Sequence, residues 1–149
     1  MALVPQPARR TTPTVLIVED DEDLARAIAD ALTAAGYGIV FARDGREALV
    51  ALAAERPNVM LVDIFMPRMN GSELLAIVRR SPEWSGIPRL VMTGANDPMI
   101  GIRSDAAVIY KPLDLDALVE LVARYCDPLR GPTQATTGAS GWQMVRWQS

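Results

Sequence analysis

Short apolar runs alternate along this chain with segments of helical period, and this alternation restricts the fold more than any other feature. Each run is apolar at successive positions, which is typical of strands buried on both faces. The runs are TVLIV (14–18), YGIVFA (37–42), PNVMLVD (57–63), IPRLVMT (87–93) and AAVIY (106–110), and the helical segments cover 21–36, 44–56, 71–81 and 114–126. The pattern predicts a five-stranded parallel sheet with helices on both faces.

A sheet of this kind predicts a doubly wound α/β fold, flavodoxin-like, with strand order 2-1-3-4-5. With 149 residues, half of them hydrophobic, the chain can bury one ordinary core. We therefore expect a flexible N-terminal arm over 1–13, one domain over 14–126, and a linker with a C-terminal tail over 127–149. The tail is rich in Gly, Thr, Ser and Pro and is too short and polar to form a second core.

Charge and composition exclude several classes of function. The formal net charge of −3 argues against a general surface for nucleic acids or anionic membranes. No apolar run is long enough to span a membrane, and prolines interrupt the N-terminal segment where a signal peptide has its apolar centre. Histidine is absent and Cys126 is the single cysteine, which excludes Ser-His-Asp catalysis, histidine-ligated zinc and an internal disulfide. We expect a soluble cytoplasmic protein.

Polar residues stand where the apolar runs end. In a doubly wound sheet, ligands bind beyond the carboxyl ends of the strands. Those ends carry Glu19 and Asp20 after the first run, Asp63 at the end of the third, Thr93 at the end of the fourth and Lys111 just after the fifth. The sequence therefore predicts an acidic metal pocket that also contains one hydroxyl and one cation.

The first apolar run continues directly into five acidic residues, Glu19 to Asp23. Acidic residues favour helix N-termini, because they accept hydrogen bonds from free backbone N–H groups and face the positive end of the helix dipole. This explains Asp21 to Asp23, but Glu19 and Asp20 precede the helix. We assign these two to the metal pocket; pure helix capping is the alternative.

Lys111 is the only lysine in the chain, beside fourteen arginines. Where this sequence needs only positive charge it uses arginine, so a single lysine next to Pro112 indicates a need for a compact ammonium group rather than a planar guanidinium. Chance retention of one lysine is the alternative.

Four segments resemble the receiver domains of response regulators, in the family's order and close to its spacing. They are VLIVEDDED, LVDIFMPRMNG, VMTG and YKPL, and the resemblance covers roughly residues 14–126. The resemblance implies that Asp63 accepts a phosphoryl group, that Thr93 binds a phosphoryl oxygen, and that Lys111 pairs with the phosphate. It also implies a cis peptide bond before Pro112.

The same resemblance implies that Glu19, Asp20, Asp63 and the backbone carbonyl of Phe65 hold Mg²⁺. Two unit charges about 4 Å apart repel by about 4 kcal/mol at an effective dielectric constant near 20. Three clustered carboxylates therefore resist joint ionisation unless a cation is present. Mg²⁺ prefers hard oxygen ligands and takes one or two carboxylates together with phosphate oxygens, whereas softer metals favour His or Cys.

Other sites would use some of the same residues. A hydrolase with an aspartate nucleophile in a DxD loop would explain Asp63, but Phe65 occupies the place of its second aspartate. An FMN-binding protein of this fold needs a phosphate-binding loop after the first strand, but here the acidic sequence EDDED occupies that place and would repel phosphate. The remaining alternative is a receiver-like docking module that binds its partner without phosphorylation. Mg²⁺-dependent chemistry at Asp63 distinguishes a phosphoaccepting receiver domain from such a docking module.

The stretch between Thr93 and Lys111 departs from the family pattern. It is several residues shorter than usual, and Pro98 and Gly101 interrupt it, so we expect the helix between the fourth and fifth strands to be short or missing. Val108 occupies the place where many receivers carry a switch aromatic. The chain is therefore closer to single-domain receivers with a shortened fourth helix, and the usual switch and dimer do not transfer to 94–109.

The resemblance implies a sensor histidine kinase or a histidine phosphotransfer protein as the phosphodonor. The expected output is a downstream protein partner or onward phosphorelay, with no direct nucleic-acid or membrane contact, and a homodimer is compatible with this interpretation. We expect a signalling domain and not an enzyme, apart from self-phosphorylation from a donor and slow self-dephosphorylation. Trp142 and Trp147, on either side of Arg146, form a candidate docking peptide, with a disordered tail as the alternative.

Overall fold

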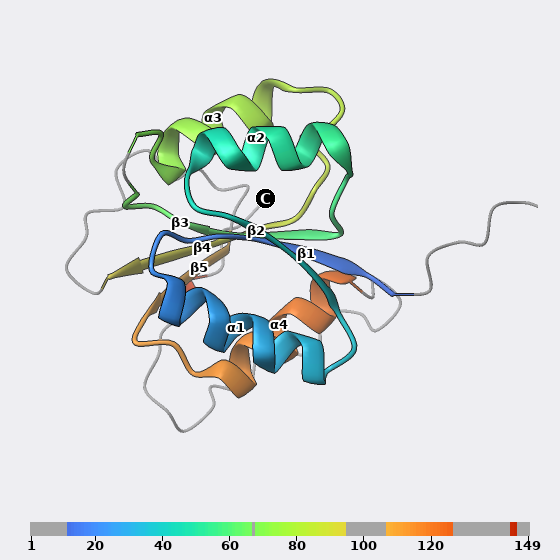
Figure 1. Cartoon of the computed structure of the whole chain (residues 1–149), viewed down its shortest axis with the longest axis vertical. Helices are drawn as coiled ribbons and strands as arrows, with labels where there is room; N and C mark the ends of the chain where they lie inside the picture. The colour runs from blue at the N-terminus through green and yellow to red at the C-terminus, as the bar shows by residue number, and fades with distance from the viewer. Residues whose placement is uncertain (1–11, 67, 95–106, 127–143, 146–149) are drawn as a thin grey trace, which may run out of the picture.

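The computed structural model describes residues 12–66, 68–94, 107–126 and 144–145. Its strands form one sheet in the order β2-β1-β3-β4-β5-β6, in which β1 to β5 are parallel (Figure 1). The strands are β1 (Thr14–Val18), β2 (Gly38–Ala42), β3 (Val59–Asp63), β4 (Arg89–Gly94), β5 (Ala107–Lys111) and β6 (Met144–Val145), and the helices are α1 (Glu22–Ala34), α2 (Gly45–Ala54), α3 (Gly71–Arg80) and α4 (Leu115–Cys126). The predicted doubly wound sheet of order 2-1-3-4-5 is confirmed.

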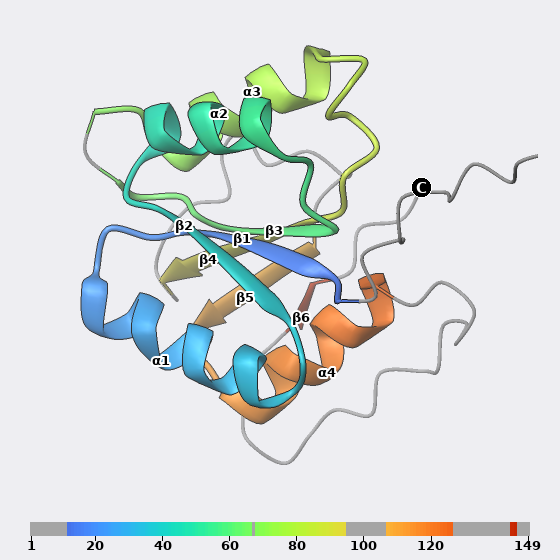
Figure 2. The same ribbon diagram turned by 45° about the vertical axis from the view of Figure 1, so that its right-hand side comes forward.

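Helices cover both faces of the sheet. Helices α1 and α4 lie on one face and α2 and α3 on the other (Figures 1 and 2). Successive side chains of a strand point to opposite faces, so that Val15 and Ile17 of β1 pack in the core beneath α1 and α4, whereas Leu16 and Val18 pack beneath α2 and α3. Strand β1 is therefore buried on both faces, as its unbroken apolar sequence predicted.

Side chains of short polar residues fix where three helices begin. The Asp21 carboxylate accepts hydrogen bonds from the backbone N–H groups of Asp23 at 3.0 Å and Leu24 at 3.2 Å. Asp44 caps α2 and Asn70 caps α3 in the same manner. These caps hold the helix N-termini at the edge of the sheet where the parallel strands end.

Strand β6 was not predicted. Met144 and Val145 fall in the segment that the sequence indicated to be a tail, and they pair antiparallel with Ile109 and Val108 of β5. The stretch between β4 and β5, where a short or missing helix was expected, lies over 95–106 and is outside the described residues. Trp142 and Trp147 are also outside them.

Candidate functional site

Parallel strands bring the predicted site residues to one edge of the sheet. Strands β1 and β3 are neighbours, and Glu19 and Asp20 directly follow β1 while Asp63 ends β3. Strand β4 lies on the other side of β3 and contains Thr93, and Lys111 ends β5 beside β4. Residues separated by as many as 92 positions in sequence therefore share one carboxyl edge.

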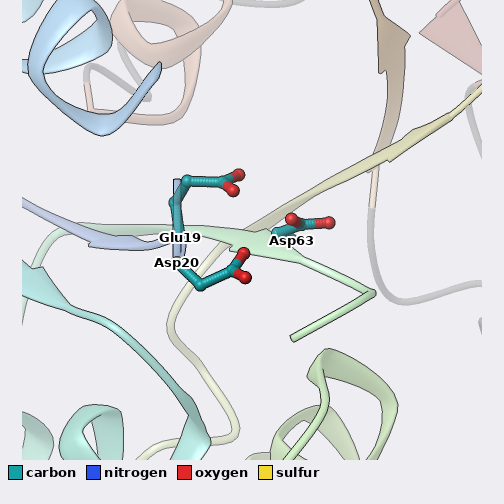
Figure 3. A group of neighbouring side chains, drawn as sticks. All are labelled: Glu19, Asp20 and Asp63. Atoms are coloured by element: carbon teal, nitrogen blue, oxygen red, sulfur yellow. The ribbon is translucent and has the colours of Figure 1, made fainter. Parts of the chain in front are cut away.

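Three carboxylates meet at this edge. Figure 3 shows the side chains of Glu19 and Asp20 extending from the end of β1 toward Asp63. One oxygen of each carboxylate lies within 4.8 Å of the other two, and the group can hold a metal ion. Glu19 and Asp63 are buried, whereas Asp20 is exposed. Asp21 caps α1 and Glu22 and Asp23 lie in its first turn, as predicted, whereas Glu19 and Asp20 precede the helix.

Lys111 supplies the cation of the site. Its Nζ donates to Asp63 Oδ2 at 3.2 Å and to Glu19 Oε2 at 3.3 Å. Burial alone lowers the pKa of Lys111, but the negative charges of Asp63 and Glu19 outweigh burial and raise it. The ammonium group is thus positioned between the two buried carboxylates.

The carboxyl group of Glu19 is strongly perturbed by its surroundings. Burial, followed by the negative charge of Asp63, raises the pKa of Glu19 from 4.5 to about 7. The Asp21 N–H group, which donates to Glu19 Oε1 at 3.2 Å, and the charge of Lys111 oppose this increase without cancelling it. One cation does not fully compensate this cluster, which is a physical reason for a second cation to bind.

This raised pKa predicts how stability depends on pH in the absence of metal. Because the folded state disfavours the charged form of Glu19, the free energy of unfolding should fall by about 2 kcal/mol as the pH rises from about 5 to 8. Urea unfolding across this range in EDTA measures the effect. Glu19→Gln should flatten this part of the profile, and an unchanged slope in that variant would refute the assignment.

The loop after Asp63 is held close to the Asp63 carboxylate. The backbone N–H of Phe65 donates to Asp63 Oδ1 at 3.2 Å, and the N–H of Gly71 donates to the carbonyl oxygen of Ile64 at 2.9 Å. A Cβ atom at Gly71 would lie 2.3 Å from the Asp63 carbonyl oxygen and 2.8 Å from Ile64 Cα. Only glycine permits α3 to begin this close to the end of β3.

Thr93 lies in the fourth strand and Pro112 directly follows Lys111 at the end of the fifth, as the sequence predicted. Thr93 is buried in β4, one residue beyond Met92, which pairs with Asp63. The peptide bond between Lys111 and Pro112 is cis, as the family resemblance implied.

Sequence reasoning missed one ion pair beside the site. Arg68 Nη1 lies 3.1 Å from Asp44 Oδ2, and the Asp44 side chain is buried. The Asp-Gly sequence at the start of α2 predicts that Asp44 caps this helix. No sequence pattern indicates which cation would lie beside the second oxygen of Asp44.

A doubly wound sheet that carries three carboxylates and a lysine at its carboxyl edge defines a class, that of CheY-like receiver domains. The family model for the response regulator receiver domain matches residues 15–123. The chain therefore belongs to the response regulator receiver domain family, whose members act in signal transduction by two-component systems.

Several known proteins are similar to this chain. A transcriptional regulatory protein of Streptomyces coelicolor, AfsQ1, is 29% identical over 140 residues, which cover 89% of this chain and 59% of the relative. A probable transcriptional regulatory protein of Mycobacterium tuberculosis, TcrX, is 34% identical over 89% of this chain and 56% of its own length. The chain thus spans little more than half the length of these curated relatives.

Solved structures agree with this family. The crystal structure of a putative response regulator from Chloroflexus aurantiacus matches with a TM-score of 0.72 at 29% identity, covering 77% of this chain and 98% of that one.

Within the described part of the chain, the helices are all too short or too polar to cross a membrane.

Proposed function

We propose that Asp63 accepts a phosphoryl group in a Mg²⁺-dependent reaction and that the phosphorylated domain acts through another protein. The observation that carries this proposal is the position of Lys111 Nζ, 3.2 Å from Asp63 Oδ2, beside a cluster of three carboxylates. Asp63 is the nucleophile, Lys111 stabilises negative charge on the transferred group, and Thr93 binds a phosphoryl oxygen. Transfer at such a site depends mainly on positioning and electrostatic stabilisation.

The donor set fits Mg²⁺. All the side-chain donors are hard carboxylate oxygens, from Glu19, Asp20 and Asp63, and the peptide of Phe65 borders the cluster through its N–H bond to Asp63. These three side chains and the Phe65 carbonyl oxygen would hold the ion. When bound, the ion would supply positive charge that stabilises the negative charge on the oxygens of a phosphoryl group.

The transfer itself needs no further group from this chain. An Asp63 carboxylate oxygen forms a bond to phosphorus while the donor's P–N bond to a histidine breaks, and the leaving nitrogen is protonated. With acetyl phosphate, the bond that breaks is the P–O bond to acetate. Water attack on the resulting acyl phosphate releases inorganic phosphate and restores Asp63.

Intact mass spectrometry tests this function. The wild-type protein, incubated with acetyl phosphate and Mg²⁺, should gain one phosphoryl group, whereas samples with EDTA or with Asp63→Asn should gain none. Equal gain with and without Mg²⁺ would contradict a metal-dependent site. Failure of the wild type to gain a group, together with no Mg²⁺-induced change in amide signals near Asp63, would support a docking module that works without phosphorylation.

The partners follow from the same chemistry. A sensor histidine kinase or a histidine phosphotransfer protein is the expected donor, and the output is a protein that distinguishes the phosphorylated from the unphosphorylated surface, or a further phosphotransfer. Homodimer formation on phosphorylation is compatible with both. The domain is then a signalling component whose own activity is limited to self-phosphorylation from a donor and slow dephosphorylation.

Phe65 is expected to lengthen the lifetime of the phosphorylated state. Phe65 is 57% exposed and lies two residues from the acceptor, where a bulky apolar ring limits the approach of water. Phe65→Asn should lose phosphate roughly threefold faster or more, because a small polar group admits and binds water. Decay is measured by intact mass after the donor is removed.

A matched control is available on β2. Phe41 is the other phenylalanine of the chain and is similarly exposed, at 53%, on a strand that β1 separates from β3. Phe41→Asn should leave the decay rate unchanged. Equal rates for wild type and Phe65→Asn would exclude a shielding role for this ring.

A further inference from the structure

An ion pair connects two loops at the carboxyl edge of the sheet. Asp44 follows β2 and Arg68 lies in the loop between β3 and α3, and strand β1 is located between β2 and β3. Arg68 Nη1 donates to Asp44 Oδ2 at 3.1 Å. The pair therefore joins the loop after β3 to the connection between β2 and α2, although β2 and β3 are not neighbours in the sheet.

Asp44 is held rigidly in this pair. Its side chain is 3% exposed, and its Oδ1 accepts a hydrogen bond from the Glu47 N–H at 2.9 Å as the N-cap of α2. The Glu47 N–H group and the Arg68 guanidinium together hold the pKa of Asp44 below its ordinary value, although burial opposes them. A buried carboxylate needs such partners, so that each oxygen of Asp44 has a defined role.

Arg68 is held in a backbone conformation that residues with side chains rarely adopt. Its φ is +66°, in the left-handed region. A conformation of this kind persists when surrounding contacts determine it. The adjacent residue provides one such contact, because the carbonyl oxygen of Met69 accepts a hydrogen bond from the Gly45 N–H at 3.0 Å. The far half of the acceptor loop is therefore attached to the start of α2 at two successive residues.

The near half of the same loop contacts the acceptor. The Phe65 N–H donates to Asp63 Oδ1, and the Ile64 carbonyl accepts from the Gly71 N–H, which closes the loop. Arg68 follows Phe65 by three residues in the sequence, so the Phe65 peptide and the attachment of Arg68 to Asp44 belong to the same short loop.

We propose that Arg68 and Asp44 are positioning residues that act as a latch, fixing the acceptor loop so that the Phe65 carbonyl keeps its place at the metal site. This inference rests on the proposed function. The latch is a property of this chain's residues and acts before any ligand binds. The effect on global stability is expected to be small, because the Arg68 side chain is 71% exposed and its removal opens Asp44 Oδ2 to water.

Three variants of the full chain test the latch. Arg68→Ala removes the cation. Asp44→Asn removes the anion but keeps an oxygen to cap α2, since asparagine caps helices as well as aspartate does. Arg43→Ala is the matched control, because Arg43 lies in the same connection and pairs with Glu47 through an exposed contact at 3.0 Å that does not involve the acceptor loop.

Two measurements separate the latch from a general loss of structure. In the absence of metal, hydrogen exchange of a peptide covering 64–71 should be faster in Arg68→Ala and Asp44→Asn than in wild type, while exchange in β1 and β3 should be unchanged. The dissociation constant for Mg²⁺ should rise about three- to tenfold in both variants. In the double variant it should rise no further than in either single variant, and Arg43→Ala should match wild type in both measurements.

The outcomes distinguish failure of the latch from failure of the proposed function. If wild type binds Mg²⁺ and Arg68→Ala shows unchanged affinity and unchanged loop exchange, the latch is refuted and the phosphoacceptor site stands. If wild type does not bind Mg²⁺ but the loop exchanges faster in both variants, the latch fixes the loop and the proposed metal site fails. Additive effects in the double variant would show that the two residues act separately and would overturn the proposal.

Discussion

Gly71→Ala is expected to lower the free energy of unfolding by about 3 kcal/mol, because the new methyl group has no space that side-chain movement could provide. Its Cβ atom would lie 2.3 Å from the carbonyl oxygen of Asp63 and 3.0 Å from the carbonyl carbon, both of which are backbone atoms at the end of a buried strand. Relief requires α3 to move away from β3, which breaks the hydrogen bond from the Gly71 N–H to the Ile64 carbonyl. The variant should therefore lose phosphoryl uptake as well as stability.

Urea unfolding and phosphoryl uptake measure the two effects, and Gly86→Ala is the matched control. A Cβ atom at Gly86 would meet only Arg56 Nη2, at 3.3 Å, which is the movable end of a long side chain. That substitution should change the unfolding free energy by no more than about 0.5 kcal/mol. If Gly71→Ala were as stable and as active as Gly86→Ala, the inference that α3 begins too close to Asp63 for any side chain would be contradicted.

Lys111→Met is the second substitution with a large expected effect. It leaves the carboxylates of Glu19 and Asp63, with side-chain exposures of 1% and 7%, without the cation that lies 3.3 and 3.2 Å away. Loss of one partner from a buried ion pair is strongly destabilising, and since Lys111 itself is 30% exposed we expect a decrease of about 2 kcal/mol in EDTA. Mg²⁺ should restore part of this stability, because in the proposed site it binds the same carboxylates.

Phosphoryl uptake should fall by about 100-fold or more in Lys111→Met, because the positive charge proposed to stabilise the transferred group has been removed. Lys111→Arg separates charge from shape. It retains the positive charge and should recover much of the stability, but its planar guanidinium does not reproduce the compact ammonium group and should recover less of the uptake. Full uptake in Lys111→Met would contradict the role of this residue.

The sheet could be predicted in detail because its signal is local and repeated. Each strand of the parallel sheet contains at least three consecutive apolar residues, and each helix begins after a short polar residue such as Asp21 or Asn70 that caps it. The proximity of Glu19, Asp63 and Lys111 followed from the topology, since parallel strands must end at one edge. The contact of Lys111 with Glu19, across 92 residues of sequence, is a consequence of that topology.

Contacts between loops could not be predicted in this way. The pairing of Asp44 with Arg68 depends on the left-handed backbone of Arg68, which no local pattern specifies for an arginine. Strand β6 was missed for a related reason. Two residues, Met144 and Val145, carry no periodicity, and their pairing with β5 is determined by the free edge of the sheet and not by their own sequence.

The most direct test of the central claim is to locate the phosphoryl group by chemical reduction. Sodium borohydride reduces an acyl phosphate to an alcohol, so that a phosphorylated aspartate is converted to homoserine and can be found in the digested protein by peptide sequencing in the mass spectrometer. After treatment with acetyl phosphate and Mg²⁺, we predict homoserine at position 63 and at no other carboxylate, and none in a sample that contains EDTA. Homoserine at position 20, or an unmodified Asp63 in protein that has gained a phosphoryl group, would contradict the claim that Asp63 is the phosphoacceptor.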